Sequence, residues 1–167
     1  MSFCKRIILL IAGLVPALCL SAQDWQQWES QLQQSCLQAD FTYVTEGKVK
    51  VSGEGKVSVQ DSCFVLDLNL MQVFCDGQRR WSVDRESREV VVEKASGAIR
   101  GAIAGYKIES CKTLAGGAVK ASLLSGDGTR IRLDIPLLKK VEKQPLSCYR
   151  FDTKTLDGSW VVTDLTD

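Results

Sequence analysis

The sequence predicts a mainly β protein of the α+β class, in which a single curved antiparallel sheet forms a half-open barrel with an N-terminal helix as plug or lid. Short runs of alternating apolar and polar residues fill most of the chain after residue 40, and three Asp-Gly pairs lie between such runs, at 76–77, 127–128 and 157–158. Alternation with a period of two is typical of a strand with one buried face, and an Asp-Gly pair favours the tight turn of a hairpin. The pattern therefore predicts an antiparallel meander with one apolar face.

The first segment has the features of a removable secretory leader. Two basic residues precede an apolar stretch from Ile7 to Leu20, and small residues follow at Ser21-Ala22. This stretch is shorter than the roughly 20 residues that a membrane-spanning helix needs. We expect residues 1–22 to be a signal peptide and residues 23–167 to form one domain. An uncleaved anchor and a lipoprotein signal with Cys19 as acceptor are the alternatives.

The predicted helix covers residues 24–38. Trp25, Trp28, Leu32 and Cys36 recur there at helical spacing. Such a helix either packs its tryptophan edge on the core or forms a movable lid over a cavity. In both cases Trp25, Trp28 and Leu32 face the sheet, so the pattern leaves the two interpretations open.

The period changes to two from Asp40 onward, where strands are expected in close succession. Gly53 and Gly55 interrupt the longest of them and predict a bend or a bulge. Residues 95–105 break the pattern as a short helix or a loop, and residues 136–145 form a connector bracketed by prolines. The expected strands are 41–45, 48–60, 63–69, 70–75, 78–84, 87–94, 106–113, 118–124, 129–135 and a last hairpin of 146–153 with 159–165.

The composition excludes several functional classes. The chain has no histidine, so catalytic triads, histidine acid–base chemistry and histidine metal sites are not available. The formal net charge is +1 and no basic face stands out, which argues against nucleic-acid binding. We expect no enzymatic activity, no metal and no cofactor. The Arg79-Arg80 pair is expected to face solvent, or else lipid headgroups or an acidic partner.

Five cysteines remain after the predicted leader, at positions 36, 63, 75, 111 and 148. An odd number leaves at least one thiol unpaired. Two interpretations stay open: most are small buried apolar side chains, or one or two disulfides form in an oxidising compartment.

The predicted apolar face is too wide for one helix to cover. A helix with its side chains is about 10–12 Å across, whereas ten strands at about 4.8 Å spacing span much more. Either the barrel closes tightly or an apolar cavity is left that accepts an apolar ligand. The residues expected to line this cavity are Phe64, Leu66, Leu68, Trp81, Val83, Ile131, Leu133, Tyr149 and Phe151.

The order of these features resembles the periplasmic outer-membrane lipoprotein carriers of the LolA/LolB type. The resemblance rests on the leader, the short helix, the Phe41-Thr-Tyr-Val strand and the glycine-bearing strand from Gly53. It also rests on the Asp76-Gly77 to Trp81 and Asp84 segment and on the late Phe151-Asp-Thr hairpin.

The resemblance implies a half-barrel with a helical lid that binds the acyl chains of lipoproteins or similar amphiphiles. Such a carrier works as a monomer in the periplasm and transfers its cargo to the outer membrane. Its partners would be an inner-membrane releasing complex and an outer-membrane acceptor. The alternative function is a non-catalytic envelope module for protein–protein interaction, with a core filled by its own side chains.

Overall fold

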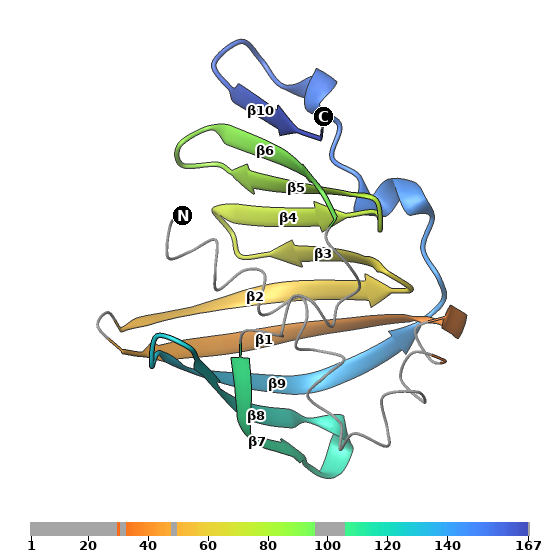
Figure 1. Cartoon of the computed structure of the whole chain (residues 1–167). Helices are drawn as coiled ribbons and strands as arrows, with labels where there is room; N and C mark the ends of the chain where they lie inside the picture. The colour runs from red at the N-terminus through yellow and green to blue at the C-terminus, as the bar shows by residue number, and fades with distance from the viewer. Residues whose placement is uncertain (1–29, 31–32, 48–49, 96–105, 167) are drawn as a thin grey trace.

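A computed structural model of the chain describes residues 30, 33–47, 50–95 and 106–166. The described residues form ten strands and three short 3-10 helices (Figure 1). The strands are β1 (Cys36–Glu46), β2 (Val51–Gln60), β3 (Cys63–Asp67), β4 (Met71–Cys75), β5 (Arg79–Asp84), β6 (Glu89–Lys94), β7 (Tyr106–Thr113), β8 (Val119–Ser125), β9 (Arg130–Val141) and β10 (Val161–Leu165). The 3-10 helices are η1 (Ala115–Gly117), η2 (Leu146–Tyr149) and η3 (Thr153–Thr155).

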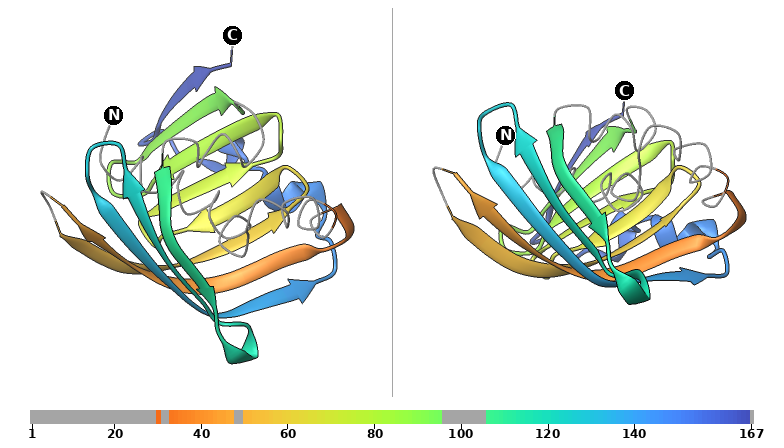
Figure 2. Two further views of the ribbon diagram at one scale, coloured as in Figure 1. Left: turned by 60° about the horizontal axis from the view of Figure 1, so that its bottom comes forward. Right: turned by 90° about the horizontal axis from the view of Figure 1, so that it is seen from below.

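All ten strands belong to one sheet, in the order β10-β6-β5-β4-β3-β2-β1-β9-β8-β7. β7 and β10 lie at its two edges, so the described sheet does not close into a barrel. Figure 2 shows its strong curvature. The prediction of a mainly β protein with a single curved sheet is therefore confirmed. Of the predicted helix, residues 30, 33 and 34 are described and are helical; its other residues up to Leu32, the leader and residues 96–105 lie outside the described residues.

Two of the three Asp-Gly pairs make the tight turns that the sequence predicts. Gly77 connects β4 with β5 at φ +88°, and Gly128 connects β8 with β9 at φ +83°. These left-handed conformations suit glycine, which has no Cβ. The Asp76 carboxylate fixes the first turn by accepting hydrogen bonds from the N–H groups of Gln78 (2.9 Å) and Arg79 (2.8 Å).

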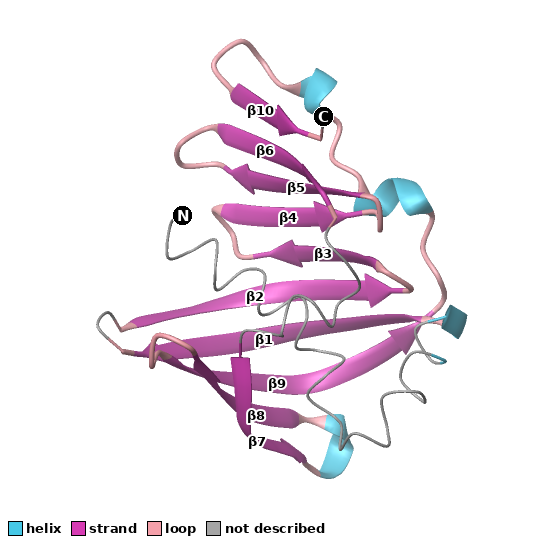
Figure 3. Ribbon diagram, in the orientation of Figure 1, coloured by secondary structure: helices cyan, strands magenta, loops and turns pink. Residues whose placement is uncertain are grey.

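The third pair, Asp157-Gly158, does not connect a hairpin, and the predicted strand 146–153 is wrong. This stretch contains η2 and the start of η3 (Figure 3). The chain leaves β9, the third strand from the β7 edge, and must cross to the free edge of β6. It arrives there parallel to β6, with Val162 opposite Val90. The sheet is therefore mixed rather than wholly antiparallel.

The paired strands β1 and β9 are longer than expected. Cys36–Gln38, predicted as the end of the helix, open β1, and the first half of the predicted connector extends β9 to Val141. The β1–β9 register shifts between Asp40 and Thr42, opposite the part of β9 that holds Pro136. A bulge tolerates proline because it leaves a backbone position outside the regular ladder.

Gly53 and Gly55 do not interrupt β2, because its ladder with β1 runs through both without a shift. Their role is to leave space for the rings of Tyr43 and Phe41, their partners on β1. A Cβ added to Gly55 would lie 2.6 Å from Phe41 Cζ and 2.7 Å from the carbonyl oxygen of Asp67. The bulge lies instead on β9, where Ile135 and Pro136 are opposite the single residue Phe41 of β1.

We predict that Gly55→Ala destabilises the protein by about 1–3 kcal/mol, because the added methyl group overpacks the contact with Phe41 and a backbone carbonyl. Gly126→Ala is the matched control, since no heavy atom lies within 4 Å of its added Cβ. Urea unfolding of the two variants checks this. Equal stability of the two variants would contradict the packing role given to Gly55.

Candidate apolar binding face

Side chains on one face of six adjacent strands form the larger of two hydrophobic clusters. The strands are β4, β3, β2, β1, β9 and β8, and we call this surface the apolar face. Its fully buried members include Leu66, Val59 and Leu123. The whole set of buried members is Leu37, Ala39, Phe41, Val57, Val59, Phe64, Leu66, Met71, Val73, Cys75, Val119, Ala121, Leu123, Ile131, Leu133 and Ile135.

The register of the ladder fixes which residues share this face, because residues directly opposite each other in an antiparallel pair point to the same side. Val57 is opposite Leu66, and Leu66 is opposite Val73. Val73 is in turn opposite Ser82. The neighbouring Trp81 therefore points to the other side of the sheet.

The nine predicted lining residues do not lie on one face. Phe64, Leu66 and Leu68 belong to the apolar face, as do Ile131 and Leu133. That these five contact a ligand stays a prediction.

The other four residues lie on the opposite face, so the expectation of a single lining is wrong for Trp81, Val83, Tyr149 and Phe151. Trp81 and Val83 form a second buried cluster with two valines of β6, and Phe151 packs against it. Tyr149 contacts the side chain of Ser58, which alternates with Val57 along β2 and so points away from the apolar face.

The second cluster is covered by the C-terminal segment, residues 142–165. Leu156 and Trp160 pack against it, and the ring of Phe151 lies 5.4 Å from that of Phe74 between centroids. Side chains of the protein itself therefore occupy the space above Trp81. This part of the sheet is covered by the protein's own C-terminal side chains.

Polar contacts hold the C-terminal segment along the sheet. The side-chain amide of Gln60 donates to the Gln144 carbonyl (2.8 Å) and accepts from the Gln144 N–H (2.7 Å). Lys143 Nζ lies 2.7 Å from a carboxylate oxygen of Asp61. Arg150 Nε donates to Asp76, whose side chain is only 5% exposed, over 2.8 Å. The segment is thus fixed at β2, at the β2–β3 turn and at the β4–β5 turn.

Tyr149 forms a further, buried anchor. Its hydroxyl lies 3.3 Å from Cys36 Sγ and 3.3 Å from Ser58 Oγ, and these two atoms are 3.1 Å apart. Burial raises the pKa of the Tyr149 phenol. The ring therefore stays neutral and joins the C-terminal segment to β1 and β2.

The members of the apolar face outside the predicted lining include four valines and one isoleucine, among them Val57, Val59 and Ile135. Alternation shows which residues of one strand share a face. The length of each turn then shows which residues of the next strand lie on that same face. Every hairpin from β2 to β6 pairs an odd-numbered residue with an even-numbered one. Counted across turns, this parity places Trp81 with Phe74 rather than with Val73.

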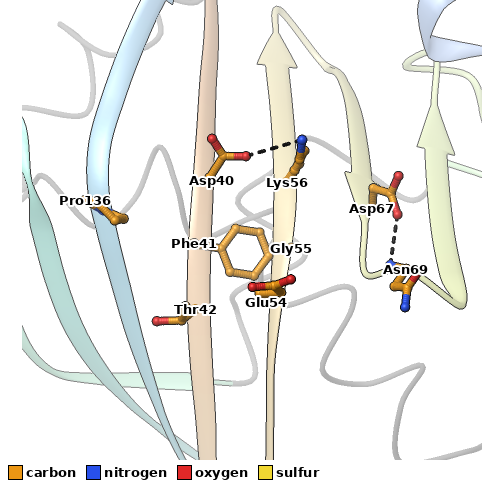
Figure 4. A pocket seen from close by; sticks show the side chains of 9 residues that line it. All are labelled: Asp40, Phe41, Thr42, Glu54, Gly55, Lys56, Asp67, Asn69 and Pro136. Carbon is orange, nitrogen blue, oxygen red and sulfur yellow. Dashed lines mark hydrogen bonds and ion pairs between the residues drawn. The ribbon is translucent and has the colours of Figure 1, made fainter.

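Shallow grooves on the opposite face have a different character. One, of about 510 Å³, runs over β1, β2 and β3 beside Pro136 (Figure 4). Its lining carries three carboxylates and one lysine, and Lys56 Nζ lies 3.9 Å from Asp40. Asp67 accepts from the backbone N–H of Asn69 over 2.9 Å. Such a polar surface does not suit a hydrocarbon tail.

Burial makes Cys63 and Cys75 poor candidates for reactive thiols. Burial is the main reason why the pKa of Cys63 rises to about 11, and it also raises the pKa of Cys75. Both thiols are therefore protonated at neutral pH and are poor nucleophiles. Cys36 and Cys148 form no disulfide.

Within the described ranges, no three metal-ligating side chains come together. Helical segments in the same ranges lack the length and apolarity that a membrane span requires.

The Arg79-Arg80 pair is divided between the two faces of the sheet. Arg79 is exposed, whereas the side chain of Arg80 is only 16% exposed and forms an ion pair with Glu93 of β6. Arg80 lies opposite Cys75, so it sits on the same side as the apolar face and at its margin. The expectation that both arginines face solvent is therefore wrong for Arg80.

Comparisons with known proteins identify similar solved structures only. No protein-family model matches the sequence, and no curated protein matches it. The solved structures that match include a LolA superfamily protein from Nitrosomonas europaea, which is 8% identical. The alignment covers 80% of this chain and 99% of that protein, with a TM-score of 0.44. At that TM-score the likeness carries no argument about function, which has to rest on the described residues.

We predict that the contact of Asp76 with the C-terminal segment makes stability depend on pH. Burial opposes ionisation of Asp76, but hydrogen bonds from the backbone N–H groups of Arg79 and Gln78 and from Arg150 hold the pKa of the carboxyl below its usual range. A lowered folded-state pKa contributes stability above the unfolded pKa of about 4, and this is lost as pH falls through the folded-state value.

Asp76→Asn removes the charge and keeps one acceptor oxygen, so the variant should be about 1–3 kcal/mol less stable than the wild type at pH 7. The difference should shrink below about pH 4. Urea unfolding at several pH values measures it. A difference that stays constant from pH 7 to pH 3 would contradict the role of the ionised carboxylate.

Proposed function

We propose that the protein is a non-catalytic carrier or chaperone that binds lipoprotein acyl chains, or similar amphiphiles, on its apolar face and delivers them to the outer membrane. In this proposal the open sheet is the half-barrel of a LolA-type carrier, and the helix predicted to precede β1, from residue 24 on, is its lid. The predicted leader places it in the periplasm. An inner-membrane releasing complex and an outer-membrane acceptor are its proposed partners.

One observation carries the proposal. Buried apolar side chains of six adjacent strands form one continuous cluster on a single face of a sheet that does not close in the described residues, while the C-terminal segment is engaged on the other face. An acyl chain that moves from water onto such a surface gains about 0.8 kcal/mol for each buried methylene group. A long chain therefore binds without any specific polar contact, as a carrier of varied lipoproteins requires.

A pair of variants on β3 and its turn tests the proposal. Leu68 packs against the apolar face, whereas Val65 alternates with Leu66 and points to the other side; both are partly buried. We predict that Leu68→Glu weakens the binding of a fluorescent long-chain fatty acid at least tenfold, because a carboxylate on the apolar face repels the tail. Val65→Glu should bind as the wild type does. Fluorescence titration of detergent-free protein measures both affinities.

Circular dichroism shows whether both variants keep the β-sheet signal. Saturable binding near one ligand per chain, lost only in Leu68→Glu, is the expected result. Equal binding by the two folded variants would contradict the assignment of the face. A wild type that binds no amphiphile at all would favour the alternative of an interaction module with a filled core.

A further inference from the structure

One polar group beside the apolar face has no partner among the described residues. The Nε atom of Arg80 is buried and makes no hydrogen bond, although the Nη2 atom of the same guanidinium contacts Glu93. Leaving a buried donor unsatisfied is unfavourable, and more so when the group is charged. The missing acceptor can be supplied by a molecule that enters the apolar face.

A second arginine of the chain shows the alternative geometry. Arg130 contacts Glu109 with both Nε (2.6 Å) and Nη2 (3.0 Å), which is the two-pronged contact typical of an arginine and a carboxylate. That pair is on the surface. Arg80 lies in the more buried pair and uses only one prong on Glu93. The Nε–H group of Arg80 is left available to another acceptor oxygen.

The surroundings of Arg80 determine what such an acceptor would be. Cys75, its partner across the β4–β5 ladder, is a buried member of the apolar face, and the Arg80 charge acts on the Cys75 thiol. Val73, two residues earlier on β4, continues the apolar face toward its centre. A charged donor thus stands at the margin of an apolar surface, which is the arrangement that an amphiphile with an anionic head requires.

We propose that Arg80 Nε binds an anionic oxygen, of a carboxylate or a phosphate, at the head of an amphiphile whose tail lies on the apolar face. This inference rests on the proposed function and gives it a substrate class, namely anionic rather than neutral or cationic amphiphiles. Glu93 orients the guanidinium through Nη2. The planar fork of arginine then presents Nε to the ligand.

The test uses four 12-carbon probes below their micelle concentrations: dodecanoate, dodecyl phosphate, dodecyl maltoside and dodecyltrimethylammonium. Isothermal titration calorimetry measures each dissociation constant. The wild type should bind the two anionic probes about tenfold more tightly than dodecyl maltoside, and the cationic probe most weakly. Inorganic phosphate alone should neither bind nor compete, because recognition requires the tail.

The double variant Arg80→Met/Glu93→Met removes both charges and leaves no buried group unpaired, a replacement that is often neutral for stability. It should bind all four probes alike, with the affinity of the wild type for dodecyl maltoside. Arg79→Gln is the matched control, because Arg79 is exposed, and it should keep the full preference for anions.

The outcomes separate the two proposals. Equal affinity of the wild type for all four probes, or an anion preference that survives in the double variant, would overturn the role of Arg80 and leave the carrier function intact. Inorganic phosphate that competes as well as dodecyl phosphate would also overturn it. Failure of every probe to bind would contradict the carrier function itself.

Discussion

The register of the β4–β5 hairpin is the constraint on which the rest of the structure depends. It pairs Val73 with Ser82 and Phe74 with Trp81. Because side chains alternate along a strand, this pairing sends the large apolar residues of β5 and β6 to the side opposite those of β1–β4. The sheet therefore has an apolar surface on each face, one over each half, and each needs its own cover. A shift of this register by one residue would place the two apolar surfaces on the same face of the sheet. It would also turn Arg80 and Ser82 to the opposite face.

The C-terminal segment is the consequence of this division. It runs from the end of β9 along the sheet to the edge of β6, where Leu156 and Trp160 close the second cluster and β10 adds a parallel strand. Its contacts at Gln60 and Asp76, together with the buried Tyr149 hydroxyl, fasten it to β1, β2 and the β4–β5 turn. The segment thereby completes the core of one half and leaves the apolar face of the other half as the surface that the proposed carrier uses.

Much of the strand pattern could be predicted from the sequence, since alternation and turn residues are local signals. The positions of β2–β6 and the turns at Gly77 and Gly128 follow from them. The sequence places Pro136 at the start of a connector, because a bulge that accommodates it depends on the register with β1, a long-range property. Tyr149 and Phe151 alternate like strand residues, yet they belong to a segment that packs over the sheet. Alternation within one strand predicts the wrong face for Trp81 and Val83, because it does not relate that strand's sides to those of its neighbours. Counting parity across the turns does.

Methyl nuclear magnetic resonance tests the central claim most directly, because it reports on both faces in one experiment. Protein with labelled leucine, valine and isoleucine methyl groups is titrated with a long-chain amphiphile. If the apolar face binds the tail, the methyl signals of Leu66, Val73 and Ile131 shift in a saturable way, while those of Val83, Val90 and Val92 under the C-terminal segment stay in place. Shifts confined to the second cluster, or no saturable shift in either group, would contradict the account.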